Sequence, residues 1–210
     1  MKIVLIECAA IDIRAGLRCD SEGFALACEQ ERAAGIAPIS VTRHDASAYE
    51  IYTGTSRAAM ETAEALFSSD RTPVCTPLLD DVPIGPFTET KRQYPLWLWR
   101  RMGGVQWRMG SQRQPEARAA VRRRAGEVID LVEGNGRDCV LIARGLYLKT
   151  LRDELYRRGY CIQGGGYWIR PLDRIRATKQ TLHCGGCIHN CLLDNPGCGI
   201  GMLKAKEQKM

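Results

Sequence analysis

The stretch EIYTGTSRAAMETA, Glu50 to Ala63, places a short apolar strand directly before a helix. Glu50 to Thr53 predicts the strand. Ser56 is a suitable N-cap for the helix, because its hydroxyl can accept a hydrogen bond from a free backbone N–H of the first turn. The apolar residues after it fall on one helical face, and they are Ala59, Met60, Ala63, Leu66 and Phe67. The stretch therefore predicts a strand-to-helix unit.

Other apolar runs predict further strands. Lys2 to Glu7 and Cys139 to Ala143 suit strands that are buried on both faces. Tyr160 to Gln163 and Tyr167 to Arg170 are expected to pair with each other around Gly164-Gly165-Gly166. This triple glycine lacks the Lys-Ser/Thr of a phosphate loop, so it predicts a turn.

Helical patterns alternate with these strands. Helices are predicted from Ser21 to Ala34, from Pro115 to Gly134, and from Leu146 to Arg158, where Gly159 stops the last one. Asp80 to Phe87 contains two prolines and a glycine and should form no regular element. The alternation predicts an α/β protein with a largely parallel sheet and helices on both faces.

The chain of 210 residues, 45% hydrophobic and 26% charged, suits one globular body with a short appendage. We expect an α/β domain over residues 1–178, with 88–114 as a basic, Trp-rich lid or insertion, and a Cys-rich tail over 179–210. The apolar run after Met1 is too short for a signal peptide, and no later run suits a transmembrane segment. We expect a cytoplasmic protein, in which most cysteines are reduced.

Positive charge is concentrated in one segment. Lys91 to Arg124 holds ten basic residues and one acid, Glu116. It also holds Trp97, Trp99 and Trp107. One interpretation is a helical lid with inward tryptophans and solvated arginines. The alternative is a surface for nucleic acid or an anionic membrane, with tryptophans stacking or inserting among the arginines.

Ligands of such sheets bind beyond the carboxyl ends of the strands, so the residues there carry most information. They are Glu7-Cys8-Ala9-Ala10, Gly54-Thr55-Ser56-Arg57 and Arg144-Gly145. The sequence here resembles the histidine phosphatase superfamily, which has the phosphoglycerate-mutase-like fold. Residues 51–63 are similar to its motif Tyr-Ser-Ser-Pro-Leu-x-Arg-Ala-x-x-Thr-Ala, and 140–145 to the strand that ends in Ser-His-Gly. Residues 1–6 match the lead-in to Arg-His-Gly-Glu, and the resemblance covers roughly residues 1–175.

The same alignment predicts a degenerate site. Glu7-Cys8 stands where the family has Arg-His, so the phosphoryl-accepting histidine is absent. Arg144 stands where the second histidine is expected, and the motif arginine falls on Ala58, with Arg57 one residue early. The resemblance places Asp81 as the proton-donating carboxylate. His44 precedes the second predicted strand, and His183 and His189 belong to the tail.

Three interpretations of this pocket stay open. In the first, Glu7 and Arg144 form an ion pair that closes a dead site. In the second, Cys8 is a thiolate nucleophile activated by Arg57 or Arg144, and the chain is an active phosphatase or phosphotransferase, a phosphoric monoester hydrolase of altered mechanism. In the third, Arg57 and Arg144 bind a phosphorylated metabolite or protein partner without turnover.

The tail carries a separate signal. Cys184, Cys187, Cys191 and Cys198 follow a Cys-x2-Cys-x3-Cys-x6-Cys pattern. Four soft ligands within this distance suit tetrahedral zinc or a 4Fe-4S cluster. We prefer zinc slightly, because it needs no assembly machinery. Metal should supply most of the folding free energy of a segment with so few apolar residues.

We therefore expect a histidine-phosphatase-like protein that does not catalyse, binds a phosphorylated ligand or partner, and carries a C-terminal metal site. The two alternatives are an active phosphatase that uses Cys8 and a nucleic-acid-associated protein that uses the basic lid and the metal tail. The sequence leaves the oligomeric state and the ligand open.

Overall fold

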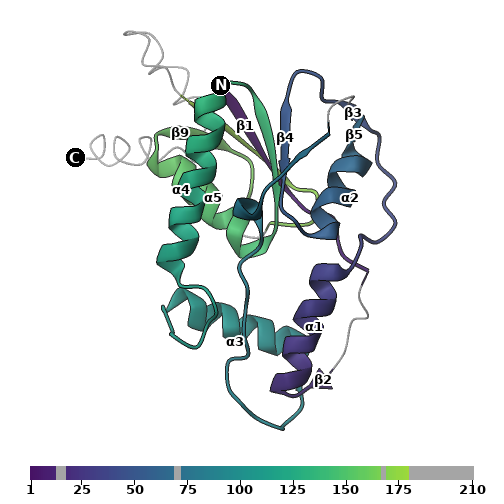
Figure 1. Cartoon of the computed structure of the whole chain (residues 1–210), viewed down its shortest axis with the longest axis vertical. Coiled ribbons are helices and arrows are strands. Elements are labelled where there is room, and N and C mark those ends of the chain that lie inside the picture. The colour runs from purple at the N-terminus through teal and green to yellow at the C-terminus, as the bar shows by residue number, and fades with distance from the viewer. Residues whose placement is uncertain (13–17, 69–71, 167–168, 180–210) are drawn as a thin grey trace, which may run out of the picture.

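The computed structural model describes residues 1–12, 18–68, 72–166 and 169–179 (Figure 1). The central sheet has six strands in the order β6-β4-β8-β1-β10-β9. These are β1 (Lys2–Glu7), β4 (Glu50–Thr53), β6 (Val74–Cys75), β8 (Cys139–Ala143), β9 (Tyr160–Gln163) and β10 (Arg174–Lys179). Strand β1 pairs in parallel with β8, which pairs in parallel with β4. The predicted α/β class with a largely parallel sheet is confirmed.

Five α-helices connect or cover these strands in the described part of the chain. They are α1 (Ser21–Ala33), α2 (Arg57–Leu66), α3 (Leu96–Arg108), α4 (Arg118–Asn135) and α5 (Gly145–Arg157). The remaining elements are short: β2 (Arg18–Cys19) pairs with β7 (Tyr94–Pro95), β3 (His44–Asp45) pairs with β5 (Phe67–Ser68), and η1 (Pro77–Leu79) is a single turn. None of the helices in the described ranges has the length and apolar content of a membrane span.

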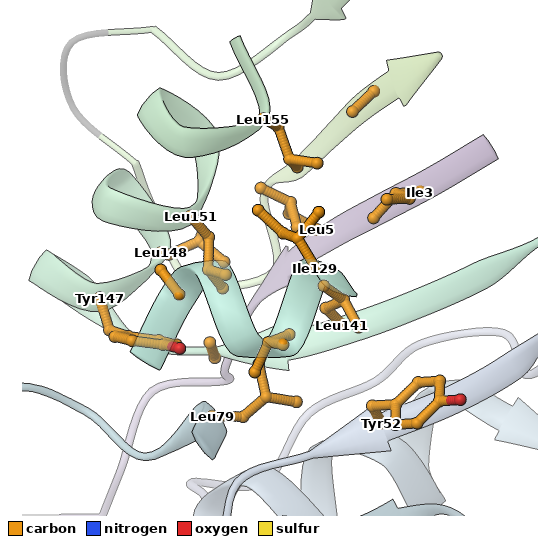
Figure 2. Packing of buried hydrophobic residues seen from close by; sticks show 14 of the residues in the cluster. Ile3, Leu5, Tyr52, Leu79, Ile129, Leu141, Tyr147, Leu148, Leu151 and Leu155 are labelled. Carbon is orange, nitrogen blue, oxygen red and sulfur yellow. The ribbon is translucent and has the colours of Figure 1, made fainter. Parts of the chain in front are cut away.

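The two faces of the sheet bury different side chains, because neighbouring residues of a strand point to opposite sides. Ile3 and Leu5 of β1 and Leu141 of β8 pack against α4 and α5 in the larger core. Figure 2 shows this packing, with Ile129 of α4 and Leu148, Leu151 and Leu155 of α5 directed at the sheet. The alternate residues Ile6, Val140 and Ile142 pack against α2 through Ala59, Ala63 and Leu66. Both cores therefore follow from the expected strands.

The hairpin expected around the triple glycine is not seen in the described residues. Strand β9 pairs antiparallel with β10. Tyr167 and Trp168 of the expected partner strand lie outside the described residues, and Ile169 and Arg170 belong to no strand. No strand was expected at β10, which inserts between β1 and β9 and is antiparallel to both. Its register sets Thr178 opposite Lys2 and Arg174 opposite Ile6. At the end of β10, the Lys179 ammonium group donates a hydrogen bond to the Glu133 carboxylate of α4 at 2.7 Å. Lys179 lies one residue after the expected end of the α/β domain at residue 178.

Helix α4 begins later than expected. It starts at Arg118 rather than near Pro115, because the residues before it are tied to other elements. The Glu116 carbonyl accepts a hydrogen bond from the Trp107 indole at 3.0 Å, and the buried Gln114 amide oxygen accepts one from the Gly85 N–H at 2.9 Å. The helix continues through Gly134 and ends at Gly136, whose φ of +65° favours glycine.

A third cluster lies at the end of the molecule where α1 and α3 meet (Figure 1). Trp99 of α3 is fully buried, stacks on Phe24 of α1 with ring centroids 5.5 Å apart, and touches the Phe87 ring at 4.5 Å. Its indole N–H donates to the Cys19 carbonyl at 3.0 Å. The basic segment therefore contains a helix that is anchored by buried Trp99 and Trp107, whereas Trp97, which the lid interpretation also expects to point inward, is 63% exposed.

Candidate functional site

The candidate site lies at the carboxyl ends of β1, β4 and β8, where the sheet order brings three chain segments together. Glu7 is the last residue of β1 and is paired in register with Ala143 of β8. Arg144 and Gly145 follow β8 and begin α5. Glu7, Cys8, Asp81 and Arg144 are close enough to influence one another's charge.

Glu7 closes the N-terminus of α5. Both of its carboxylate oxygens accept from the Gly145 N–H, at 3.0 and 3.1 Å. The N-cap residue, Arg144, makes no capping hydrogen bond with its side chain. A helix N-terminus attracts negative charge because its first N–H groups are unpaired and the helix dipole is positive there. The Glu7 carboxylate therefore occupies the position that an external anion would prefer.

Burial nevertheless raises the pKa of Glu7 to about 7, and the nearby Asp81 carboxylate acts in the same direction. The Gly145 hydrogen bond and the charges of Arg144 and Lys149 lower the pKa of Glu7, but by less in total. Near neutral pH, Glu7 is thus divided between a carboxylate that caps α5 and a neutral acid that does not attract the helix N-terminus as strongly.

The expected ion pair between Glu7 and Arg144 is not formed. Their side chains make no salt bridge, although the Arg144 charge lowers the pKa of Glu7 from a distance. The reason is the N–H of Gly145, which lies closer to the carboxylate and satisfies it. Within the described residues, no hydrogen bond or ion pair of the half-buried Arg144 side chain is seen. Arg144 is therefore a cation available to a ligand.

Cys8 is a poor candidate nucleophile. The residue is 2% exposed, and its backbone N–H donates to the Ala143 carbonyl at 3.0 Å. Burial raises the pKa of the Cys8 thiol to about 12, with the Arg144 charge opposing this only in part. A thiol must be ionised and accessible to attack phosphorus. Cys8 instead packs as a small apolar side chain between β1 and α2.

Asp81 joins the site from the loop after η1. Its carboxylate accepts from the Val82 N–H at 2.8 Å, and a Cβ added to Gly145 would lie 3.6 Å from its Oδ1 atom. Desolvation raises the pKa of Asp81 to about 6, and Arg144 opposes the shift. The pKa of Asp81 thus lies below that of Glu7, so Glu7 is the carboxyl group that changes charge nearest to neutral pH.

Arg57 is not brought to these residues. Its side chain forms an ion pair with Glu61, one helical turn later, at 2.6 Å, and is 64% exposed. The other Glu61 oxygen accepts from the Ile36 N–H at 2.8 Å. The motif position one residue later is Ala58, which is fully buried. The one-residue offset therefore directs the guanidinium to Glu61 and not to Glu7, Asp81 and Arg144, in keeping with the 100° step of a helix.

Sequence reasoning missed the structural role of Arg124. Its guanidinium binds the Glu116 carboxylate at 2.9 Å, donates to the Leu78 carbonyl at 3.2 Å, and lies 4.3 Å from the centre of the Tyr147 ring. Arg124 thus fixes the turn before Asp81 against α5. The signal was available, because Arg124 lies three residues after Val121 and four before Val128, on the buried face of α4.

The remaining predicted residues are His44 and the four cysteines of the tail. His44 is exposed in β3, beside Phe67. Cys184, Cys187, Cys191 and Cys198 lie outside the described residues, so the structure does not test the metal site. Within residues 1–12, 18–68, 72–166 and 169–179, no cluster of His, Cys, Asp and Glu could hold a metal ion.

Neither the known protein-family models nor the curated proteins match this sequence. Solved structures do resemble it. Phosphoserine phosphatase from Entamoeba histolytica, in complexes with phosphoserine and with 3-phosphoglyceric acid, has a TM-score of 0.44 and 15% identity, over 74% of this chain and 80% of that one. A mycobacterial glucosyl-3-phosphoglycerate phosphatase with VO3 has a TM-score of 0.43 and 16% identity, over 74% of this chain and 82% of that one. The similarity to these histidine phosphatase superfamily members concerns the fold alone.

Proposed function

We propose that this chain is a non-catalytic, histidine-phosphatase-like protein that binds a phosphorylated small molecule or protein partner. The ligand's phosphate would lie at the carboxyl ends of β1 and β8. One observation carries the proposal: the Arg144 side chain has no ionic partner in the described structure, while the neighbouring Cys8 thiol is buried and un-ionised. Such a pocket offers a cation for binding a phosphate and no group suited to attack it.

Glu7 makes this binding sensitive to protons. A phosphate that approaches the N-terminus of α5 competes with the Glu7 carboxylate for the Gly145 N–H. Protonation removes both the competition and the repulsion between the two anions. Because the pKa of Glu7 is about 7, anion affinity should rise as the pH falls from 8 to 6.

The test is calorimetric titration with inorganic phosphate and, in parallel, with sulfate, whose charge is constant between pH 6 and 8. We expect Arg144→Gln to weaken binding roughly 10- to 100-fold, as the loss of a charged hydrogen bond does. Arg57→Gln, which changes the same charge at the same sheet edge, is the matched control and should leave binding unchanged. Equal effects of the two variants, or no binding by the unchanged protein, would refute the proposed pocket.

Glu7→Gln separates competition from mere structural damage. The amide is neutral at every pH, so this variant should bind sulfate more tightly than the unchanged protein at pH 8 and should lose most of the pH dependence, with the part due to Asp81 remaining near pH 6. A variant that binds more weakly at pH 8 yet keeps its thermal stability would show that Glu7 assists the anion and does not compete with it.

The alternative, an active phosphatase that uses Cys8, makes an opposite prediction. We expect no hydrolysis of p-nitrophenyl phosphate above background, because the Cys8 thiol is inaccessible and has a pKa of about 12. Turnover that persists through purification and is abolished by Cys8→Ser would establish the alternative. Turnover that survives Cys8→Ser would indicate a contaminant or another nucleophile.

We also propose that Cys184, Cys187, Cys191 and Cys198 bind one zinc ion or a 4Fe-4S cluster. The support is the chemistry of four closely spaced thiols, which suit either centre. Metal analysis of anaerobically purified protein tests it: one zinc per colourless chain selects zinc, and iron with sulfide and absorption near about 400 nm selects the cluster. Replacing all four cysteines with serine should abolish the metal content; metal content that persists contradicts the site.

A further inference from the structure

Helix α3 carries large apolar side chains on the side that faces solvent as well as on the side that faces the protein. Its inner side carries the buried Trp99, Gly103 and Trp107. With about 100° per residue, the opposite side carries residues that fall within a sector of about 140°. We call this sector the α3 outer face. It comprises the exposed residues Trp97, Arg101, Met102, Val105 and Arg108 and, directly after the helix, Met109; Leu98 falls in the same sector but is half-buried.

The apolar members of the α3 outer face are strongly exposed. Trp97 is 63% exposed and Met109 is 80% exposed, and the two residues between them, Met102 and Val105, are 38% and 40% exposed. A surface helix of a globular protein usually carries polar residues on its outer side. A helix with apolar residues on both sides is usually buried on both sides, within the protein or against a partner. An exposed apolar group of this kind marks an interaction surface.

The polar members of the α3 outer face are both arginines. Arg101 and Arg108 are exposed, and neither makes an ion pair within the described residues. This distinguishes them from Arg100 on the inner edge, which bonds Glu31 of α1, and from Arg124, which binds Glu116. The α3 outer face therefore presents unpaired positive charge interspersed with large apolar side chains.

We propose that the α3 outer face binds the surface of an anionic lipid bilayer, with the helix axis parallel to the membrane plane. Trp97, Met102, Val105 and Met109 would enter the boundary between headgroups and acyl chains, and Arg101 and Arg108 would reach back to lipid phosphates. Tryptophan is favoured at this boundary, and arginine can extend its apolar stem while its charge stays in the headgroup layer.

Charge and composition favour this occupant over two others. A symmetric dimer through the same face would set Arg101 and Arg108 against their own copies, which is repulsive without intervening anions. A nucleic acid would use the arginines and Trp97, but it offers nothing for the aliphatic side chains of Met102, Val105 and Met109, since its recognition relies on phosphate contacts and aromatic stacking.

The experiment is co-sedimentation of the full chain with vesicles of phosphatidylcholine containing 30 mol% phosphatidylserine, compared with vesicles of phosphatidylcholine alone. We expect binding to the anionic vesicles that weakens as salt is added, because part of the attraction is electrostatic. Absence of binding to anionic vesicles overturns the proposal. Equal binding to both vesicles overturns its electrostatic component and, with it, the proposed role of the arginines.

Paired variants separate the two contributions. Arg101→Gln/Arg108→Gln should lower the vesicle partition coefficient about 30-fold, whereas Arg118→Gln/Arg122→Gln, the same charge loss on α4, should change it several times less. Trp97→Ser/Met109→Ser should lower it at least about 10-fold. Tyr156→Ser on α5, also strongly exposed at 58%, is the apolar control and should have no effect.

Each other outcome identifies a different occupant. If the apolar variant binds vesicles as the unchanged chain does, the contact is superficial and the proposed insertion is wrong. If a single-stranded oligonucleotide binds more tightly than the vesicles and competes with them, the face is a nucleic-acid surface. If the chain dimerises without lipid and Trp97→Ser/Met109→Ser abolishes the dimer, the face is a subunit interface. Circular dichroism and thermal melting show that each variant is folded.

Discussion

Helices α2 and α5 begin at the same edge of the sheet, but their N-termini are closed in different ways. Ser56, immediately before α2, accepts from the Ala59 N–H at 3.4 Å. Glu7, which closes α5, comes from a strand 138 residues earlier in the chain. The Ser56 cap is a local contact, and its hydroxyl does not titrate. The Glu7 cap is a tertiary contact, and its carboxyl group has a pKa of about 7. The comparison shows that only one of the two depends on the assembled sheet.

The largest effect should come from the core beneath α5. Leu148→Ala removes a fully buried side chain of α5 and should cost about 2 to 5 kcal/mol of unfolding free energy, measured by urea denaturation. It should also speed hydrogen exchange at the Gly145 N–H relative to the Ala59 N–H, because α5 is held against β1 less tightly. Leu66→Ala in α2 is the matched control and should favour exchange at Ala59. Equal changes at both amides would show that the two N-termini open together.

The second-largest effect should be the pH dependence of stability, which distinguishes the Glu7 cap of α5 from the Ser56 cap of α2. The pKa of Glu7 is higher in the folded chain, at about 7, than its ordinary value of 4.5. The folded state therefore binds the proton more tightly, so this contribution to stability is fully present below pH 4.5 and is lost as the pH rises to about 7. A shift of this size corresponds to at most about 3 kcal/mol. Unfolding free energies of the unchanged chain and Glu7→Gln, measured from pH 4 to 8, should differ by a pH-dependent amount of this sign. Parallel curves would contradict the raised pKa.

The smallest effect should come from the local cap. Ser56→Ala should destabilise the chain by about 0.5 to 1 kcal/mol, at the low end for an N-cap because the hydrogen bond is long. Its cost should be the same at pH 5 and pH 8, since serine does not titrate there. Arg57→Ala, which removes an exposed pair with Glu61, should change stability less than Ser56→Ala does, because solvent screens the pair. If the destabilisation by Ser56→Ala depended on pH, the N-terminus of α2 would be electrostatically coupled to Glu7 at the N-terminus of α5.

The same contrast explains what could be predicted from the sequence. Strands β1, β4 and β8 were predicted with their observed bounds, because each is a short apolar run whose pattern is local. The Ser56 cap was predicted for the same reason. Strand β10 was missed, because it alternates arginine with Ile175 and Ala177 and follows loop residues, so its strand character depends on pairing with β1.

The candidate site was predicted in part. We expected Glu7, Cys8, Asp81 and Arg144 to lie near one another, because the resemblance to the histidine phosphatase superfamily places them at one edge of the sheet. In the structure, these residues are close enough to influence one another's charge. The sequence could not show that Glu7 would bond the Gly145 N–H in preference to Arg144, because that choice depends on the distance between two side chains and one backbone group. Arg57 was expected to bind the phosphate together with Arg144, whereas its side chain pairs with Glu61 of the same helix. Its position one residue before the motif arginine explains this, because one residue changes the direction of a helical side chain by about 100°.

The direction of β10 has a consequence for experiments on this chain. Because β10 runs against β1, with Thr178 opposite Lys2, the backbone that leaves the sheet at Lys179 starts from the edge farthest from Glu7. At about 3.3 Å per residue, the length of β1 separates the two points by roughly 17 Å. A fluorophore, affinity tag or protease site introduced directly after Lys179 therefore begins at the opposite end of β1 from the proposed anion site. Spectroscopic signals from a reporter placed there and from a reporter near Glu7 can then be recorded in one sample.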